Sequence, residues 1–415
     1  MHWEISMETG MSFETKKNIC FVVQRYGNEV VGGAESLCMQ YAQELKRYFC
    51  IDVVTSCAID YDTWENYYQE GQTEMDGVTV YRYHSVHPRR NELIGPLTEA
   101  VYSNPDNSLR LGKKWLKEVG PYCPGIIRHI KKYKKHYDVF IFVGYHYYNS
   151  TFGMPCVPGK AIFLPTAHDE PPLRNCNYFK ILFSMPRAFL FLSEEERDFV
   201  LQFFHIPSST PSVVTGLWIE TPKIAAGYAE SVKQKYKIAE RYVMYTGRMD
   251  DTKNCSSMFE NFMTYKEKCQ NNIQLVLAGK AKMQIPQRED IRYIGFVDEA
   301  EKMHLLAGAL GFIMPSGHES LSISTLEAMA CGTPILAYGG SEVIKKHIEK
   351  SGSGFIYYNA EDFTEKMDFL INKKQIRDEM GTSGRKYVSE NYNRHDIINK
   401  LATFIYDMCE RKHVV

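Results

Sequence analysis

Residues 315–340 read PSGHESLSISTLEAMACGTPILAYGG and contain a polar loop, a helical pattern and an apolar run in that order. The apolar run 310–314 just before this stretch predicts a buried strand. Residues 322–331 predict a helix ended by Gly332, and residues 335–338 predict a second strand. A strand, a helix and a second strand in succession are the repeating unit of a parallel sheet. This stretch therefore predicts an α/β fold.

The same alternation covers most of the chain. Continuous apolar runs bounded by turns predict strands that are covered on both faces, as in parallel sheets. The predicted strands are residues 18–24, 51–55, 78–84, 138–144, 161–165 and 188–193 in the first half, and 242–246, 273–278, 292–295, 310–314 and 335–338 in the second. The predicted helices include residues 34–48, 255–265, 299–306, 361–371, 374–390 and 396–409. We therefore predict two Rossmann-like, doubly wound domains.

The boundary between the domains is predicted near residues 206–226, which contain three prolines and many small polar residues. We expect residues 1–17 to form a flexible tail, 18–215 the N-terminal domain and 216–392 the C-terminal domain. A chain of 415 residues agrees with two domains, because single cores stop growing at about 250–300 residues.

The composition excludes several classes of protein. A formal net charge of -1 creates no field that would attract nucleic acid. The eleven cysteines include no CxxC pair, so neither a zinc ribbon nor a thioredoxin motif is supported, and scattered thiols are typical of a reducing compartment. The N-terminus lacks the apolar core of a signal peptide, and no apolar stretch approaches the roughly 20 residues of a membrane span. We expect a cytoplasmic protein, able to act at the inner face of a membrane.

Glu319 and Glu327 stand with seven residues between them, the first in the loop after a predicted strand and the second on the following helix. Ligands of open α/β sheets bind at the carboxyl ends of the strands. The amides of Leu321 and Ser322 start the helix without intrahelical partners and suit an anion, while Glu327 suits the hydroxyls of a ribose. A capped helix with two incidental glutamates remains the alternative on spacing alone.

Arg248 and Lys253 follow the predicted strand 242–246 directly, in the segment YTGRMDDTKN. Two cations at the end of a strand suit a diphosphate, since arginine binds phosphate oxygens bidentately. The alternative is a solvated basic pair that Asp250 and Asp251 neutralise.

Gly32 and Gly33 follow the first predicted strand, where they allow a ligand to approach the backbone at a helix N-terminus. This loop lacks the GxGxxG pattern of dinucleotide-binding proteins, and a simple strand-to-helix turn is the alternative. His168, in the segment LPTAHDEPPL after another strand, is a candidate to contact a sugar hydroxyl or the reacting carbon. With 13 histidines in the chain, a structural role for this one is the alternative.

Together these four segments resemble the retaining GT-B glycosyltransferases of glycosyltransferase family 4, over roughly residues 18–410. The resemblance implies two domains that face each other across a cleft, with the acceptor bound by the N-terminal one and the nucleotide sugar by the C-terminal one. Residues 393–415 would form a helix that crosses back to the N-terminal domain. No cofactor and no metal are implied, and no D-x-D triplet follows a strand. The co-substrate would be a nucleoside diphosphate sugar.

The resemblance also implies roles for individual residues. Glu319 matches the glutamate that contacts the donor sugar, and Glu327 matches the one that binds the ribose. Arg248 and Lys253, in the loop that Gly247 opens, match the basic pair that holds the diphosphate. His168 matches the active-site histidine.

Three further segments complete the implied donor site. Gly32 and Gly33 match the family's N-terminal glycine loop, and Phe296 and Val297 lie in the segment IGFV that resembles the loop against the nucleotide base. Many members carry glycine and phenylalanine after the first glutamate. This chain has Ser320, Leu321 and Ser322 instead. Backbone amides there can still donate hydrogen bonds to the sugar, but the departure leaves the identity of the donor sugar open.

The acceptor is predicted only as a class, a glycan or a lipid-linked molecule used in cell-surface polysaccharide or glycolipid synthesis. Residues 125–137, GIIRHIKKYKKHY, predict a strongly basic helix that suits anionic lipid head groups, with a solvated helix face as the alternative. Two other functions remain: a sugar-nucleotide-binding protein without transfer activity, and a sugar-nucleotide epimerase of the same architecture.

Overall fold

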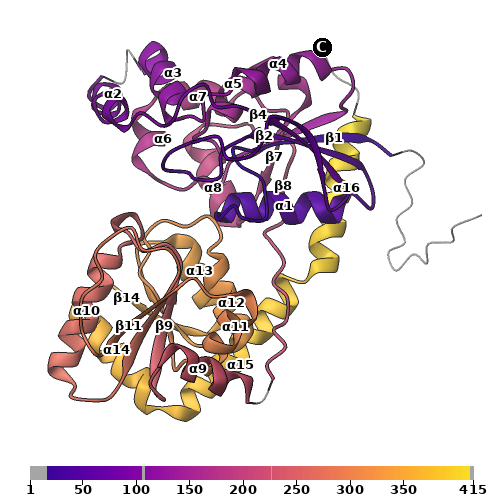
Figure 1. Ribbon diagram of the computed structural model, residues 1–415. Helices are drawn as coiled ribbons and strands as arrows, with labels where there is room; N and C mark the ends of the chain where they lie inside the picture. Colours follow the sequence, from indigo (N-terminus) through magenta and orange to yellow (C-terminus); the bar gives the residue numbers. More distant parts are fainter. Residues whose placement is uncertain (1–15, 105–107, 226, 412–415) are drawn as a thin grey trace, which may run out of the picture. The chain divides into compact units, whose positions relative to one another are not determined.

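The computed structural model describes residues 16–104, 108–225 and 227–411. The chain divides into two compact units (Figure 1): one runs to Gly216 and resumes at His395, and the other is Leu217–Arg394. Most of the predicted tail, residues 1–15, lies outside the described residues.

The N-terminal unit is built on an eight-stranded sheet within the described residues, in the order β3-β4-β2-β1-β5-β6-β7-β8. Its strands are β1 (Asn18–Val22), β2 (Cys50–Ser56), β3 (Gly71–Met75), β4 (Val78–Tyr83), β5 (Val139–Val143), β6 (Ala161–Leu164), β7 (Ala188–Phe191) and β8 (Ser212–Val214). All neighbouring pairs are parallel except β3 with β4. The carboxyl ends of seven strands therefore meet at one edge of the sheet.

Helices cover both faces of this sheet (Figure 1). They are α1 (Gly33–Leu45), α2 (Asn91–Ser103), α3 (Ser108–Val119), α4 (Pro124–Tyr133), α5 (Tyr148–Gly153), α6 (Pro171–Asn175), α7 (Tyr178–Phe183), α8 (Glu194–Phe203) and α16 (Arg394–Glu410). The core on one face packs Trp115 of α3, Ile130 of α4 and Phe179 of α7 against apolar side chains of the strands.

The C-terminal unit contains a parallel six-stranded sheet within the described residues, in the order β11-β10-β9-β12-β13-β14. Its strands are β9 (Tyr242–Thr246), β10 (Gln274–Ala278), β11 (Ile291–Gly295), β12 (Phe312–Met314), β13 (Ile335–Tyr338) and β14 (Gly354–Tyr357). This is the Rossmann order 3-2-1-4-5-6, in which the chain reverses direction across the sheet between the first and fourth strands. Here the reversal lies between β9 and β12.

The helices of this unit are α9 (Tyr228–Tyr236), α10 (Cys255–Lys268), α11 (Glu299–Gly308), α12 (Ile323–Cys331), α13 (Glu342–Ser351), α14 (Ala360–Asn372) and α15 (Lys374–Asn391). Helices α10 and α14 lie on one face of the sheet, where Phe259 and Phe363 join the core (Figure 1). Helices α11, α12 and α15 lie on the other face. The predicted α/β class with two Rossmann-like units is confirmed.

Three strands depart from the prediction. Strand β3 was missed and is antiparallel, so the N-terminal sheet is not purely parallel. Strand β8 lies inside residues 206–226, predicted as a boundary segment without a strand. Strand β14, with helix α13 before it, occupies residues 340–360, for which no element was predicted.

The basic helix is shorter than predicted. Helix α4 ends at Tyr133 rather than at residue 137, and a turn follows in which the amide of His136 donates to the carbonyl of Tyr133 at 2.9 Å. The amide of Asp138 then bonds to the carbonyl of Asn18 at 2.8 Å, which places the chain beside β1 for the next strand. Among the described residues, no helix is long and apolar enough to cross a membrane.

Candidate donor site and active-site histidine

The candidate donor site forms where the C-terminal sheet reverses direction. Strands β9 and β12 are neighbours and parallel, so their carboxyl ends open at the same edge. The loop after β9 carries Arg248 and Lys253, and the loop after β12 carries Glu319. A reversal point of this kind is where open α/β sheets bind ligands.

Gly247 begins the loop after β9 with a φ of 144°, a backbone region that residues with a side chain rarely adopt. Its amide donates to the carbonyl of Ala278 at 3.0 Å. A Cβ on Gly279 would lie 2.1 Å from the carbonyl oxygen of Gly247, so glycine at 279 is required for the two strand ends to approach. The two glycines thus set the path of the chain that leads to Arg248.

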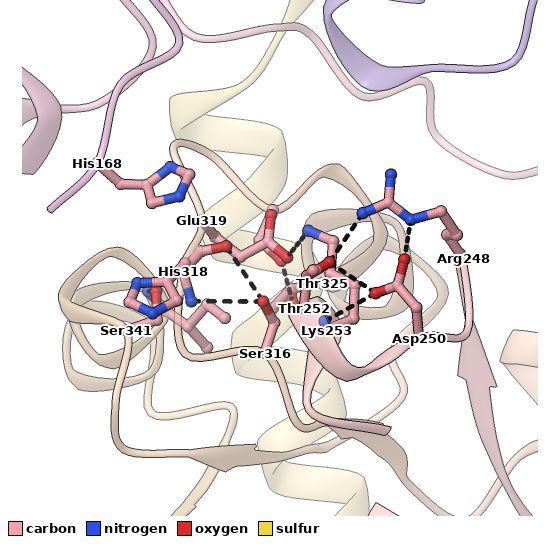
Figure 2. A network of polar contacts seen from close by, with 12 residues as sticks. His168, Arg248, Asp250, Thr252, Lys253, Ser316, His318, Glu319, Thr325 and Ser341 are labelled. Carbon is pink, nitrogen blue, oxygen red and sulfur yellow. Dashed lines mark hydrogen bonds and ion pairs between the residues drawn. The ribbon is translucent and has the colours of Figure 1, made fainter. Parts of the chain in front are cut away.

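Arg248 is held by residues of its own loop (Figure 2). Its Nε and Nη2 bond respectively to a carboxylate oxygen of Asp250 and to the hydroxyl of Thr252, the latter at 2.9 Å. Thr252 donates in turn to the other oxygen of Asp250 at 2.6 Å. Burial raises the pKa of Asp250, but the hydrogen bond from Thr252 and the charge of Arg248 outweigh burial and hold this pKa below its usual range. Asp250 is therefore ionised and neutralises Arg248, as the solvated-pair alternative expected.

Lys253 bridges the two loops. It lies in the short 3-10 helix η4 (Asp251–Lys253), and its Nζ donates to Glu319 Oε1 at 2.6 Å (Figure 2). The side chains of Lys253 and Glu319 are 30% and 16% exposed. In the loop that carries Glu319, the hydroxyl of Ser316 donates to the carbonyl of His318 at 3.1 Å. A cation and an acid predicted from sequence segments 66 residues apart thus form one ion pair.

The N-terminus of α12 follows the same loop. Ser322 is its N-cap residue, with a left-handed φ of 62° and no side-chain bond to the backbone amides of the helix. His347 Nε2 donates to the carbonyl of Leu321 at 2.9 Å, and burial lowers the pKa of His347 to about 4. The imidazole is therefore neutral near pH 7 and holds the loop of Ser320, Leu321 and Ser322. The amides that start α12 suit an anion.

Glu327 lies on α12 and has a salt-bridge partner of its own. Both of its carboxylate oxygens are 2.9 Å from Lys302 Nζ of α11. Burial raises the pKa of Glu327, while the charge of Lys302 opposes that rise. The structure shows no direct bond from Glu327 to Glu319, Lys253 or Arg248. A ribose that binds Glu327 would therefore share this carboxylate with Lys302.

Phe296 lies directly after β11, the edge strand of the sheet. Its side chain is 63% exposed, which is unusual for a phenylalanine, whereas Val297 is half-buried. An exposed aromatic ring offers a face on which a planar base can stack.

The glycine loop of the N-terminal unit surrounds a buried ion pair. Glu35 Oε1 accepts from Arg25 Nη2 at 2.6 Å and from Gln24 Nε2 at 2.8 Å. A Cβ on Gly32 would lie 2.2 Å from Glu35 Oε2, so this ion pair requires glycine at 32. A Cβ on Gly33 would meet nothing within 4 Å, so the backbone there is open to a ligand.

His168 lies at the carboxyl end of β6 in the N-terminal unit. Its Nε2 is 3.4 Å from Glu170 Oε1. Asp169 pairs instead with Arg174, which is on α6. His168 therefore stands at the edge of its sheet where parallel α/β units bind ligands.

Several residues of these sites were not predicted. They are partners of predicted residues rather than candidates themselves: Thr252, Lys302, His347 and Glu170. No spacing in the sequence indicates Lys302 or His347, because they reach the site from other helices. The described residues contain no cluster of three or more His, Cys, Asp or Glu side chains that could hold a metal ion.

Comparison with known proteins finds a similarity that lies within the C-terminal unit. Residues 229–387 match the family model described as glycosyl transferases group 1. This stretch of the C-terminal unit is therefore similar to the glycosyl transferases of group 1. Arg248, Lys253, Glu319 and Glu327 all lie inside the matched residues.

Among curated proteins, the chain is similar to the O-antigen chain mannosyltransferase B of Escherichia coli, with 28% identity over 163 residues. This match covers 36% of the chain and 42% of the relative. The chain spans less than half the length of the first curated relatives it matches.

Solved structures extend the likeness to the whole fold. A sucrose-phosphate synthase from Thermosynechococcus elongatus superposes with a TM-score of 0.68 at 14% identity, over 95% of this chain and 99% of that one. Anabaena Alr3699/HepE in complex with UDP-glucose gives 0.68 at 13% identity, over 94% of this chain and 99% of the other. At this identity the matches show the fold alone. With the family match, they confirm the predicted resemblance to group 1 glycosyltransferases of GT-B fold.

Proposed function

We propose that the protein is a retaining hexosyltransferase that moves a sugar from a nucleoside diphosphate sugar to a glycan or lipid-linked acceptor. The observation that carries this proposal is the ion pair between Lys253 and Glu319 beside Arg248, at the reversal point of a group 1 domain. These residues offer two cations for a diphosphate and one acid for a sugar hydroxyl in a single place.

The proposed reaction needs no covalent nucleophile from the protein. The bond between the anomeric carbon and the diphosphate oxygen breaks, and an acceptor oxygen bonds to that carbon on the same face. The acceptor's proton passes to the departing diphosphate. Arg248, Lys253 and the amides that start α12 stabilise the charge that develops on the leaving group, which is electrostatic catalysis. We propose that these groups do the work for which other transferases use a metal ion.

The remaining predicted residues take supporting roles in this proposal. Glu319 contacts the donor sugar, Glu327 binds the ribose, and Phe296 with Val297 contacts the base. In the N-terminal unit, Gly33 and His168 contact the reacting sugar or the acceptor. The curated relative is named a mannosyltransferase and one structural neighbour holds UDP-glucose, which supports a hexose as the transferred group and cell-surface polysaccharide or glycolipid as the product class.

A thermal-shift panel tests the donor class directly. We expect one of UDP, GDP and ADP, or a sugar derivative of one of them, to raise the melting temperature, because a ligand that binds only the folded state stabilises it by about 2.7 kcal/mol at 100 times its Kd. The Phe296→Ala variant should lose most of that shift for the same nucleotide, while its melting temperature without ligand stays unchanged. A flat response to the whole panel would contradict nucleotide binding.

A release assay separates transfer from the two other functions. A transferase liberates nucleoside diphosphate from its donor when an acceptor is present. A binding protein without activity liberates no nucleoside diphosphate. An epimerase changes the configuration of the sugar, and its product is still a nucleoside diphosphate sugar.

We further propose contact with anionic lipid at the inner face of the membrane. The exposed side chains of Arg128, Lys131 and Lys132 on α4, with Lys134 and Lys135 beyond it, form a basic ridge, and the apolar side of α4 is buried in the core. In the part of the chain that the structure describes, no carboxylate pairs with this ridge.

Flotation with liposomes that contain anionic lipid tests the ridge. The double variant Lys131→Gln, Lys132→Gln should bind roughly 30-fold more weakly, since each lysine near an anionic surface contributes about 1 kcal/mol. The control is Lys345→Gln, Lys346→Gln on α13, where both lysines already pair with glutamates. Equal flotation of the two double variants would contradict a role for α4.

A further inference from the structure

The loop that carries His168 is fixed by a buried carboxylate. After β6, Thr166 takes a left-handed φ of 53°, and the amide of Ala167 donates to Glu196 Oε1 at 2.6 Å. The amide of Leu192 donates to the other oxygen of Glu196 at 2.7 Å. Glu196 is 2% exposed. One side chain thus ties the ends of the neighbouring strands β6 and β7 together and sets the backbone position of His168.

A second carboxylate lies against the imidazole ring. Glu170 Oε1 is 3.4 Å from His168 Nε2. The same oxygen accepts a hydrogen bond from the hydroxyl of Tyr145 at 2.6 Å. Tyr145 follows β5 and is 4% exposed, so its hydroxyl is a rigid donor. The three side chains form a chain from the core to the imidazole, in the order Tyr145, Glu170, His168.

The Glu170 carboxylate neither caps the helix that follows it nor pairs with the arginine of that helix. Glu170 is the N-cap residue of α6, but its side chain makes no capping bond to the helix amides. The arginine of that helix, Arg174, pairs with Asp169 rather than with Glu170. Within the described ranges, the contacts of the Glu170 carboxylate are therefore with Tyr145 and His168.

We propose that Glu170 is a positioning residue for His168: its carboxylate, held by the Tyr145 hydroxyl, orients the imidazole and keeps a proton on Nε2. The inference rests on the proposed function, in which His168 contacts the substrate. A carboxylate beside one ring nitrogen fixes the tautomer and ring orientation of a histidine. Glu170 thereby determines which ring nitrogen presents a proton and which presents a lone pair.

The neighbouring titratable groups come from three elements. They are Tyr145 and His146 after β5, Tyr102 on α2, and His168 with Asp169 in the loop of Glu170 itself. Burial lowers the pKa of His146 to about 4, so this second imidazole is neutral near pH 7. Glu170 is accordingly the acid that faces the His168 ring.

The experiment is an NMR titration of the His168 imidazole. Its signal is identified as the one that disappears in the His168→Asn variant. We expect Glu170→Gln to lower the measured pKa of His168 by about one pH unit, a tenfold change in its protonation equilibrium. Tyr145→Phe should lower this pKa in the same direction by a smaller amount. Asp169→Asn is the matched control, because Arg174 already neutralises that carboxylate, and it should shift the titration much less than Glu170→Gln.

Turnover supplies the second readout. Glu170→Gln should reduce kcat about tenfold with the KM for the donor unchanged, and Glu170→Asp should recover part of the loss. An unaltered His168 titration in a folded Glu170→Gln protein overturns the inference. If the proposed function were wrong instead, the titration would still shift but no donor would be consumed by any variant.

Discussion

Replacing Arg248 by alanine is expected to lower kcat for sugar transfer by about 10²- to 10³-fold, the usual cost of removing one group that stabilises charge in a transition state. The free energy of unfolding of this variant should change little. The Arg248 side chain is 40% exposed, and an ion pair at that exposure contributes about 0–1 kcal/mol to folding. Asp250 keeps its bonds from Thr252 and from the amide of Lys253 when the guanidinium is removed. The measurement is single-turnover release of nucleoside diphosphate, together with a melting curve.

Arg288 provides a matched control in the same unit. It pairs with Asp290 two residues later, as Arg248 pairs with Asp250, and its side chain is 38% exposed. Arg288 precedes β11 and so lies at the amino end of the sheet, away from the candidate site. Arg288→Ala should keep full turnover. Equal loss in the two variants, or near-normal turnover in Arg248→Ala, would show that Arg248 does not act on the leaving group.

The second large effect concerns Lys253 and Glu319 as a pair. Each single variant, Lys253→Met and Glu319→Gln, should lose about 100-fold in turnover, and the double variant should lose little more than either one. The physical reason is their 2.6 Å ion pair: removing one partner leaves the other misplaced, so most of the damage is shared. Turnover of all three variants at saturating donor completes the cycle.

The control pair is Lys235 with Glu301, which joins α9 to α11 and involves neither the loop after β9 nor the loop after β12. Lys235→Met should leave turnover unchanged. If the losses from Lys253→Met and Glu319→Gln multiply in the double variant, the two residues act independently, and the ion pair is not a unit of the site.

The strands found from the sequence and those missed differ in where they lie in the sheets. Strands such as β5 and β9 are buried along their whole length, so their sequences are continuous apolar runs. The three missed strands, β3, β8 and β14, are all at sheet edges and are partly exposed, which interrupts the apolar pattern. For β3 a signal did exist, since Asp76 and Gly77 form a two-residue turn with positive φ before β4.

The residues of the candidate site also fall into those that the sequence indicated and those that it did not. Residues such as Arg248, Lys253 and Glu319 are candidates because each stands just after a predicted strand, and parallel strands bring such positions to one edge. Partners that come from other helices were not predicted. Lys302 reaches Glu327 from α11, and His347 reaches the carbonyl of Leu321 from α13. Contacts between helices depend on how they pack on the sheet, which local sequence spacing does not record.

The sequence by itself therefore determined the buried strands, the α/β class and the position of the candidate loops after those strands. These follow from local hydrophobic periodicity and from the geometry of parallel sheets. Only the tertiary structure decided which charges meet: Arg248 with Asp250, Lys253 with Glu319, Glu327 with Lys302 and His168 with Glu170. A salt bridge needs its nitrogen and oxygen within about 4 Å of each other, and positions at that scale are set by the packing of the whole unit.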